Sequence, residues 1–177
     1  IRGGTLEIDG TSPLTEEKYT GTIAMRDFRV IEAPVLAKLL TLGSLTGIAS
    51  VLNGQGIMFE KLRGQFVHTD DLFTLKRLKA YGSSIGITVE GTADTKAEQL
   101  QLEGTVIPAY TLNKMLGEVP IIGNIVGEGV FATNYKIVGS FDNPEVKVNP
   151  LSTLTPGIIK DFFRELSRLD EQQTAKR

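Results

Sequence analysis

Two glycine-containing stretches of the sequence match patterns that present catalytic or cofactor-binding groups. The stretch GSSIG, residues 82–86, fits G-x-S-x-G, which presents a nucleophilic serine on a strained turn from a strand into a helix. The residues after it alternate like a strand, and the single histidine, His68, precedes Ser84, against the usual order of that triad. The stretch is therefore predicted to be a hairpin turn whose first two residues accept unusual backbone angles. A triad assembled in space in another order is the alternative.

The second stretch, GEGVFA at residues 127–132, fits G-x-G-x-x-A, a dinucleotide fingerprint that must lead into a helix. Residues 130–141 alternate instead like a strand, and no parallel βαβ pattern surrounds them. His68 is predicted to be a solvated residue at a strand end, and Asp70 and Asp71 to form a turn rather than a catalytic pair. The sequence therefore predicts a protein that is not an enzyme and has no cofactor.

Composition excludes several other kinds of site. The 177 residues include no Cys and one His, which excludes disulfides and thiolate zinc sites and leaves any metal site to carboxylates. The formal net charge is −2, no stretch is a basic run, and Trp is absent, so a nucleic-acid partner is not expected. No apolar run reaches the ~18 residues that span a bilayer. No signal peptide opens the chain, which reads as a piece of a longer protein.

Most of the chain alternates between apolar and polar residues with a period of two, which is typical of a half-buried antiparallel sheet. Strands are expected near residues 3–9, 18–31, 57–68, 72–81, 84–92, 98–107 and 129–141. A recurring unit places a glycine near the middle or end of a strand, which indicates a bulge, a bend or a close backbone approach. The glycines of this unit are Gly21, Gly64, Gly91, Gly104 and Gly139.

Three segments interrupt the alternation. Residues 34–52 are apolar nearly all round a straight helix, so a kink at Gly43 into two short helices is expected, with Gly43 as a flexible point or a left-handed cap. Residues 111–126 begin with a short helix and continue as an apolar run broken by Gly and Pro. Residues 155–169 form the clearest amphipathic helix, and residues 170–177 are a polar tail.

We therefore predict an α+β, β-dominated fold in one domain over residues 1–169. A curved, groove-like antiparallel meander would be flanked by short apolar helices and by the C-terminal amphipathic helix. The apolar excess of the glycine-broken segments either fills a core or meets lipid or a membrane, and the sequence leaves both alternatives open. The candidate lipid- or membrane-contacting residues are Leu36, Leu39, Leu40, Ile48, Leu52, Ile121, Ile122 and Ile125.

Longer stretches of the sequence resemble one known family, the AsmA-like bacterial envelope proteins related to the TamB and YhdP groups. The resemblance is to their C-terminal region and extends from about residue 19 to residue 163. It is carried by residues 33–40 (APVLAKLL), 43–47 (GSLTG), 105–113 (TVIPAYTLN), 119–123 (VPIIG), 127–139 and 141–157.

The resemblance implies a periplasmic β-structure, tethered to the inner membrane by a segment absent from this chain, with an apolar inner face and no catalytic motif. The function it implies is that of a terminal module in a lipid-transfer protein, which supports phospholipid transport to the outer membrane and envelope integrity. The alternative is a structural or docking module that binds an envelope protein without contacting lipid. The expected partners are phospholipid or a membrane surface, and other envelope proteins.

Overall fold

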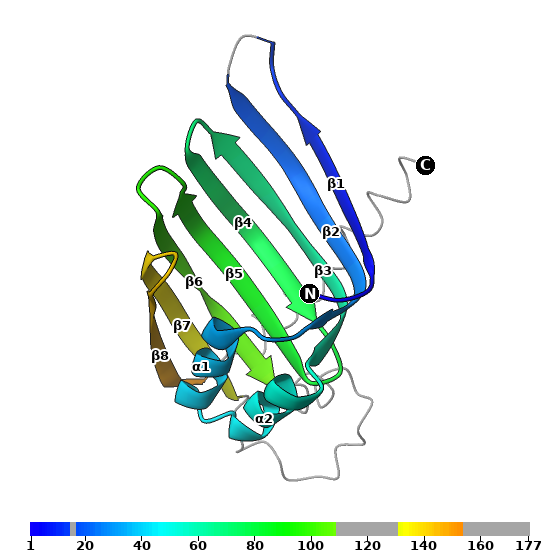
Figure 1. The fold of residues 1–177 in the computed structure, drawn as a ribbon, viewed down its shortest axis with the longest axis vertical. Coiled ribbons are helices and arrows are strands. Elements are labelled where there is room, and N and C mark those ends of the chain that lie inside the picture. Colours follow the sequence, from blue (N-terminus) through cyan, green and yellow to red (C-terminus); the bar gives the residue numbers. More distant parts are fainter. Residues whose placement is uncertain (15–16, 109–130, 154–177) are drawn as a thin grey trace.

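An antiparallel sheet makes up most of the described chain (Figure 1). The computed structural model describes residues 1–14, 17–108 and 131–153. The strands are β1 (Thr5–Thr11), β2 (Lys18–Val30), β3 (Ile57–Thr69), β4 (Leu72–Tyr81), β5 (Ile85–Asp94), β6 (Gln99–Pro108), β7 (Phe131–Ser140) and β8 (Pro144–Thr153). Each pairs with its neighbour in sequence, so the eight-stranded sheet is open and runs in the order β1 to β8. The predicted β-dominated antiparallel fold is confirmed.

Two short helices, α1 (Pro34–Leu42) and α2 (Thr46–Gly54), connect β2 to β3 and lie at one end of the sheet (Figure 1). Pro34 occupies the first turn of α1, where its missing N–H costs nothing. The predicted break near Gly43 is confirmed, but the left-handed residue there is Ser44, with φ 60°. Gly43 itself has φ −79°, so its role as a left-handed cap is wrong.

Position 43 needs glycine because the neighbouring atoms leave little room for a side chain. A Cβ placed on Gly43 would lie 3.1 Å from Thr133 Cγ2 and 3.2 Å from the Leu39 carbonyl oxygen. We expect Gly43→Val to lower the free energy of unfolding by about 1–2 kcal/mol through overpacking against β7. Urea unfolding measures this loss, and Ser44→Gly is the control, because glycine relieves the left-handed φ and should leave stability equal or higher. Equal stability of Gly43→Val and the unsubstituted chain would contradict the close packing.

The two faces of the sheet differ in polarity, because the register aligns side chains of one kind across all strands. One transverse row reads Gly10, Gly21, Phe66, Leu75, Gly91, Leu102, Ile137 and Val146 from β1 to β8. The next row, one residue along each strand and on the opposite side, reads Thr11, Thr20, Val67, Thr74, Thr92, Gln101, Val138 and Glu145. We call these sides the apolar face and the polar face.

The hydrophobic core forms where α1 and α2 cover one end of the apolar face. Leu39, Leu40 and Leu52 of the helices are buried in one cluster with side chains of β2 to β8. Phe28 and Phe59 stack within it, with ring centroids 5.4 Å apart. The buried strand residues of this cluster are Phe28, Ile57, Phe59, Ala80, Ile85, Val106, Tyr135, Ile137 and Val146.

Some predicted boundaries differ from the structure. The first strand begins at Thr5 rather than residue 3, because Gly3 and Gly4 have φ of 69° and 81°. The strand β8 was not predicted. The predicted segments 111–126, 155–169 and 170–177, and most of the GEGVFA stretch, lie outside the described residues.

Candidate functional site

The serine of the GSSIG stretch and the single histidine lie at opposite ends of the sheet. Ser84 belongs to the turn between β4 and β5, closed by a 2.9 Å hydrogen bond from the Gly82 N–H to the Ile85 carbonyl. His68 lies near the end of β3, paired with Phe73 at the start of β4. Ten residues of β4 separate the two positions, about 30 Å of extended chain. The turn prediction is confirmed, and these two side chains form no catalytic pair in this structure.

The reason for glycine at position 82 differs from the prediction. Its φ is not in the left-handed region, and neither is that of Ser83. A Cβ on Gly82 would instead collide with the Met58 carbonyl oxygen and lie 2.9 Å from the Phe59 Cα. The turn therefore needs glycine because the β3 backbone passes beside it.

His68 is part of an aromatic group on the apolar face rather than a solvated turn residue, which corrects the prediction. Its ring centroid lies 6.1 Å from that of Tyr19 and 6.0 Å from that of Phe73. Phe73 also stacks on Phe66, with centroids 5.4 Å apart and ring planes 11° from parallel. The group lies at the end of the sheet away from α1 and α2.

The apolar face continues well beyond the part that the helices cover. A row near the far end of the strands reads Tyr19, His68, Phe73, Ala93, Leu100, Gly139 and Pro144. The side chains of Phe66, Phe73, Leu75 and Val89 are only half-buried, and Ile8 is exposed. We call this half-exposed region, between the helices and the far ends of the strands, the open apolar face. This partly exposed apolar surface is the candidate functional site.

Large side chains lie flat over glycines of the neighbouring strand on this face. A Cβ on Gly21 would come within 2.8 Å of the Phe66 ring, and a Cβ on Gly104 within 2.8 Å of the Tyr135 hydroxyl. Both are directly paired positions, Gly21 with Phe66 and Gly104 with Tyr135. The same Cβ atoms would also collide with the Asp9 and Thr88 carbonyl oxygens, so the predicted close backbone approach is confirmed at Gly21 and Gly104.

Tyr135 closes a local break in the pairing of β5 and β6. Thr88 and Thr105 are not paired through their backbones there. The Thr105 N–H instead donates a hydrogen bond to Thr88 Oγ1 over 2.9 Å. The Tyr135 hydroxyl donates to the Thr88 carbonyl oxygen over 2.7 Å. Burial raises the pKa of Tyr135 well above the usual 10.0, because the charged phenolate would lose its hydration.

Tyr135 should make stability depend on pH in the alkaline range. The pKa of Tyr135 is raised in the folded state, so the protonated phenol stabilises the fold. This contribution to the free energy of unfolding is complete below the unfolded-state pKa, near 10.0, and is lost as the pH rises above that value. We expect the free energy of unfolding to fall by up to ~1.4 kcal/mol per pH unit more in the unsubstituted chain than in Tyr135→Phe. Urea titrations at a series of alkaline pH values measure the difference, and parallel curves for the two proteins would contradict it.

The polar face holds an open groove of about 740 Å³ over β4 to β8. Four of its polar side chains bind one another: Thr105 Oγ1 donates to Asn134 Oδ1 over 2.8 Å, and Lys136 Nζ lies 2.8 Å from Glu103 Oε2. The hydrogen bond and charge of Glu103 raise the pKa of Lys136, but both side chains are exposed, so the ion pair adds little stability. This groove is therefore a weaker candidate than the open apolar face.

The structure brings five of the sequence-predicted contact residues together in the core. Leu39, Leu40 and Leu52 are buried there, and Leu36 and Ile48 pack against the same cluster partly buried. For these five, the structure shows the core-filling alternative that the sequence left open. Ile121, Ile122 and Ile125 lie outside the described residues.

The residues of the open apolar face are not among the contact residues predicted from the sequence. They include Phe66, Phe73, Leu75 and Val89. The period-two alternation predicted that these residues share the apolar side of a sheet. It carries no information on how much of that side other elements cover.

Comparison with known proteins gives no family to assign: no family model matches the chain, and no similar curated protein or solved structure was found. Within residues 1–14, 17–108 and 131–153, no helix has the length and apolar character needed to cross a membrane. No group of three or more His, Asp or Glu side chains in this part of the chain is placed to hold a metal ion.

Proposed function

We propose that this chain binds the acyl chains of phospholipid on the open apolar face, as the terminal module of a lipid-transfer protein. The observation that carries the proposal is the partial exposure of Phe66, Phe73, Leu75 and Val89 on the apolar face, outside the core cluster that α1 and α2 cover. A contiguous apolar surface that other elements leave partly uncovered is a candidate binding surface for apolar partners.

The size of the open apolar face suits an acyl chain. Successive apolar rows stand two residues apart, which is about 6.6 Å along the strands. The rows through Tyr19, Gly21 and Ile23 therefore span about 13 Å between their centres. Half of a bilayer's hydrocarbon core is ~15 Å deep. One acyl chain lying along the strands would cover these three rows.

The cellular setting is part of the same proposal. The resemblance to AsmA-like proteins supports a periplasmic module, tethered to the inner membrane by a segment absent from this chain and serving phospholipid transport to the outer membrane. A groove-like curvature of the sheet around the acyl chain belongs to this proposal too. No enzymatic step is needed, because transfer along an apolar surface changes no bond.

A charge on the open apolar face should block lipid binding without unfolding the protein. Leu75 lies in the middle of the face, on β4, and outside the core cluster. We expect Leu75→Glu to reduce crosslinking to a photoactivatable phospholipid at least about fivefold, because a carboxylate opposes the approach of an acyl chain. Crosslinking yield and thermal unfolding are measured on the same samples.

The matched control is Thr74→Glu, which adds the same charge one residue away on the polar face. This variant should crosslink as the unsubstituted chain does. Absence of crosslinking by the unsubstituted chain, or equal loss in both folded variants, would rule out lipid binding on this face.

A docking module that binds an envelope protein without lipid is the second candidate, and the edge strand β1 favours it. All seven residues of β1 are exposed, and among the described strands it pairs only with β2. Its outer edge offers backbone N–H and C=O groups to a further strand. Lipid-independent pull-down of an envelope protein, abolished by Ile8→Pro, would support this candidate.

A further inference from the structure

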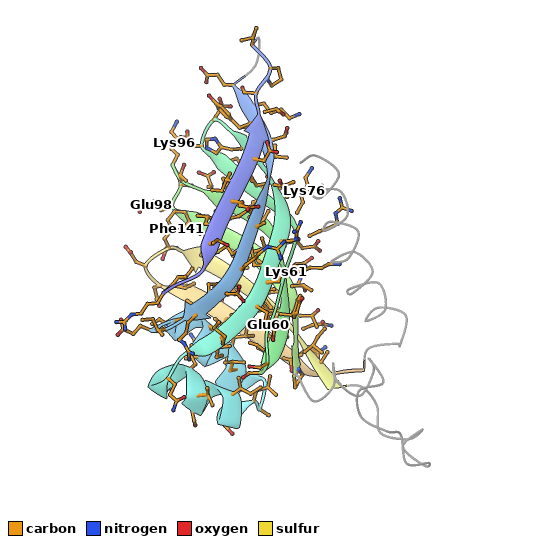
Figure 2. All side chains as sticks on the ribbon, turned by 90° about the vertical axis from the view of Figure 1, so that its right-hand side faces the viewer. Glu60, Lys61, Lys76, Lys96, Glu98 and Phe141 are labelled. Atoms are coloured by element: carbon orange, nitrogen blue, oxygen red, sulfur yellow. The ribbon has the colours of Figure 1, made fainter. Side chains whose placement is uncertain are left out.

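Four loops at the far ends of the strands form one rim of the molecule, opposite α1 and α2. Their described residues are 12–14 and 17, 70–71, 95–98 and 141–143, and we call these residues the loop rim. Neighbouring loops are joined: the Thr95 N–H donates to the Asp71 carbonyl over 2.8 Å, and the Phe141 N–H to the Glu98 carbonyl over 3.1 Å. Figure 2 shows Lys96, Glu98 and Phe141 grouped on one side of the molecule.

Exposed apolar side chains are placed along this rim. Leu14 is fully exposed in the first loop, Phe141 is 41% exposed in the last, and Leu72 is 41% exposed directly after the second. Tyr19, 51% exposed, stands just behind them as the first member of the outermost apolar row. The hydrogen bonds between the loops hold the second, third and fourth in place, so the exposure of Phe141 belongs to a fixed surface.

The rim is continuous with the open apolar face. Directly behind it lie the rings of Tyr19, His68 and Phe73, two of which combine an apolar ring with a polar group. Side chains of this kind favour the boundary between water and lipid hydrocarbon. An acyl chain that enters past the rim would meet these rings first and the apolar rows next.

The charge of the rim restricts the kind of surface it can meet. Its described residues include five carboxylates and one lysine: Glu17, Asp70, Asp71, Glu98 and Asp142 against Lys96. Such a rim is repelled by an anionic bilayer, because the negative surface potential of anionic lipids attracts basic segments and repels acidic ones. A zwitterionic lipid surface carries no such penalty.

We infer that the loop rim docks on a zwitterionic phospholipid bilayer, with Leu14, Leu72 and Phe141 inserted among the headgroups, so that lipid enters the open apolar face from this end. The inference rests on the proposed function, because it names the end at which the same face is loaded. α1 and α2 close the other end of the face.

The test uses the absence of Trp from the chain, which makes one introduced Trp a unique reporter. Phe141→Trp is mixed with phosphatidylcholine vesicles, and its emission is followed. We expect a blue shift and increased intensity as the ring enters the interface. Val51→Trp, on the exposed side of α2 at the opposite end, is the matched reporter and should not change.

A second measurement removes the apolar contacts. The combined variant Leu14→Ser, Leu72→Ser and Phe141→Ser should bind phosphatidylcholine vesicles at least about tenfold more weakly in flotation, because exposed apolar side chains supply the insertion energy. Leu42→Ser with Val51→Ser removes two side chains of similar exposure from the helices and should bind normally. Vesicles containing phosphatidylglycerol should bind the unsubstituted chain more weakly than phosphatidylcholine alone.

The outcomes separate this inference from the proposed function. Normal flotation of the rim variant, a shift only at Val51→Trp, or tighter binding to anionic vesicles would each overturn docking through the rim. A chain that crosslinks lipid yet floats with no vesicle would also overturn it, and would leave lipid binding on the open apolar face intact. Binding of the rim to an envelope protein alone would replace the bilayer as its partner.

Discussion

Leu40→Asp is expected to unfold the domain. Leu40 lies in α1 with no exposed surface, inside the cluster that joins both helices to the sheet. The substitution removes a buried leucine and places a carboxyl group where the surrounding cluster is apolar, which costs at least about 4 kcal/mol. Domains of this size are stable by ~5–15 kcal/mol, so much or all of the stability is lost. Urea unfolding and circular dichroism measure the effect.

Val51→Asp is the control, because Val51 lies in α2 with 44% of its surface exposed. The same charge there should change the free energy of unfolding by less than about 1 kcal/mol. A Leu40→Asp protein that stays folded but no longer crosslinks lipid would reverse the interpretation. The first helix would then contact lipid, as the sequence alone suggested for Leu40.

Gly104→Ala is expected to cost roughly 2–4 kcal/mol, although it adds a single methyl group. The new Cβ would collide with the Thr88 carbonyl oxygen and lie 2.8 Å from the Tyr135 hydroxyl. Both atoms belong to the hydrogen bond that closes the break between β5 and β6. The alanine therefore separates the strands or displaces the tyrosine, and a thermal melt with near-ultraviolet circular dichroism of Tyr135 detects either.

The matched substitution is Gly47→Ala, because a Cβ on this glycine of α2 meets no atom within 4 Å. Alanine is the better helix former, so this variant should be equally stable or gain up to ~1 kcal/mol. Equal melting temperatures for the two alanine variants would show that the sheet relaxes around position 104 without loss.

Strand positions were predictable from the sequence because alternation reports directly on a half-buried sheet. The predicted strand at 72–81 coincides with β4, and those at 84–92 and 98–107 begin within one residue of β5 and β6. The same signal failed for β8, which contains Pro144 and Pro150. Pro144 is its first residue, and Pro150 falls where the register with β7 shifts. These are positions that tolerate proline, although proline in a sequence counts against a strand.

The candidate site was less predictable, because it depends on which elements cover which surface. The sequence showed that Leu39 and Leu52 are apolar at helical spacing, but not that they would pack against the strands beside each other. Once the helices occupy one end of the apolar face, the apolar residues left exposed on it include Ile8 of β1 and Tyr19 of β2, and those left partly exposed include Phe66 of β3. The turn at 82–84 was predicted correctly, but from unusual backbone angles, whereas glycine is needed at position 82 because the Met58 carbonyl lies beside it. A contact with a residue so distant in sequence cannot be read from the local sequence.

The sequential strand order has a consequence for how this chain folds. Every strand pair except β2–β3 and β6–β7 is a hairpin closed by a short loop, so the sheet can start forming at several places and lengthen from each. Pairing of β2 with β3 requires the two ends of the connecting segment, residues 31–56, to come together. The entropic cost of closing such a loop is modest, because each doubling of its length adds only ~0.6 kcal/mol. Because every strand pairs with its neighbour in sequence, a hairpin could be added to or removed from the β3–β6 region without any other connection having to change. Sheets of this order can therefore change width by whole hairpins while keeping one continuous apolar face.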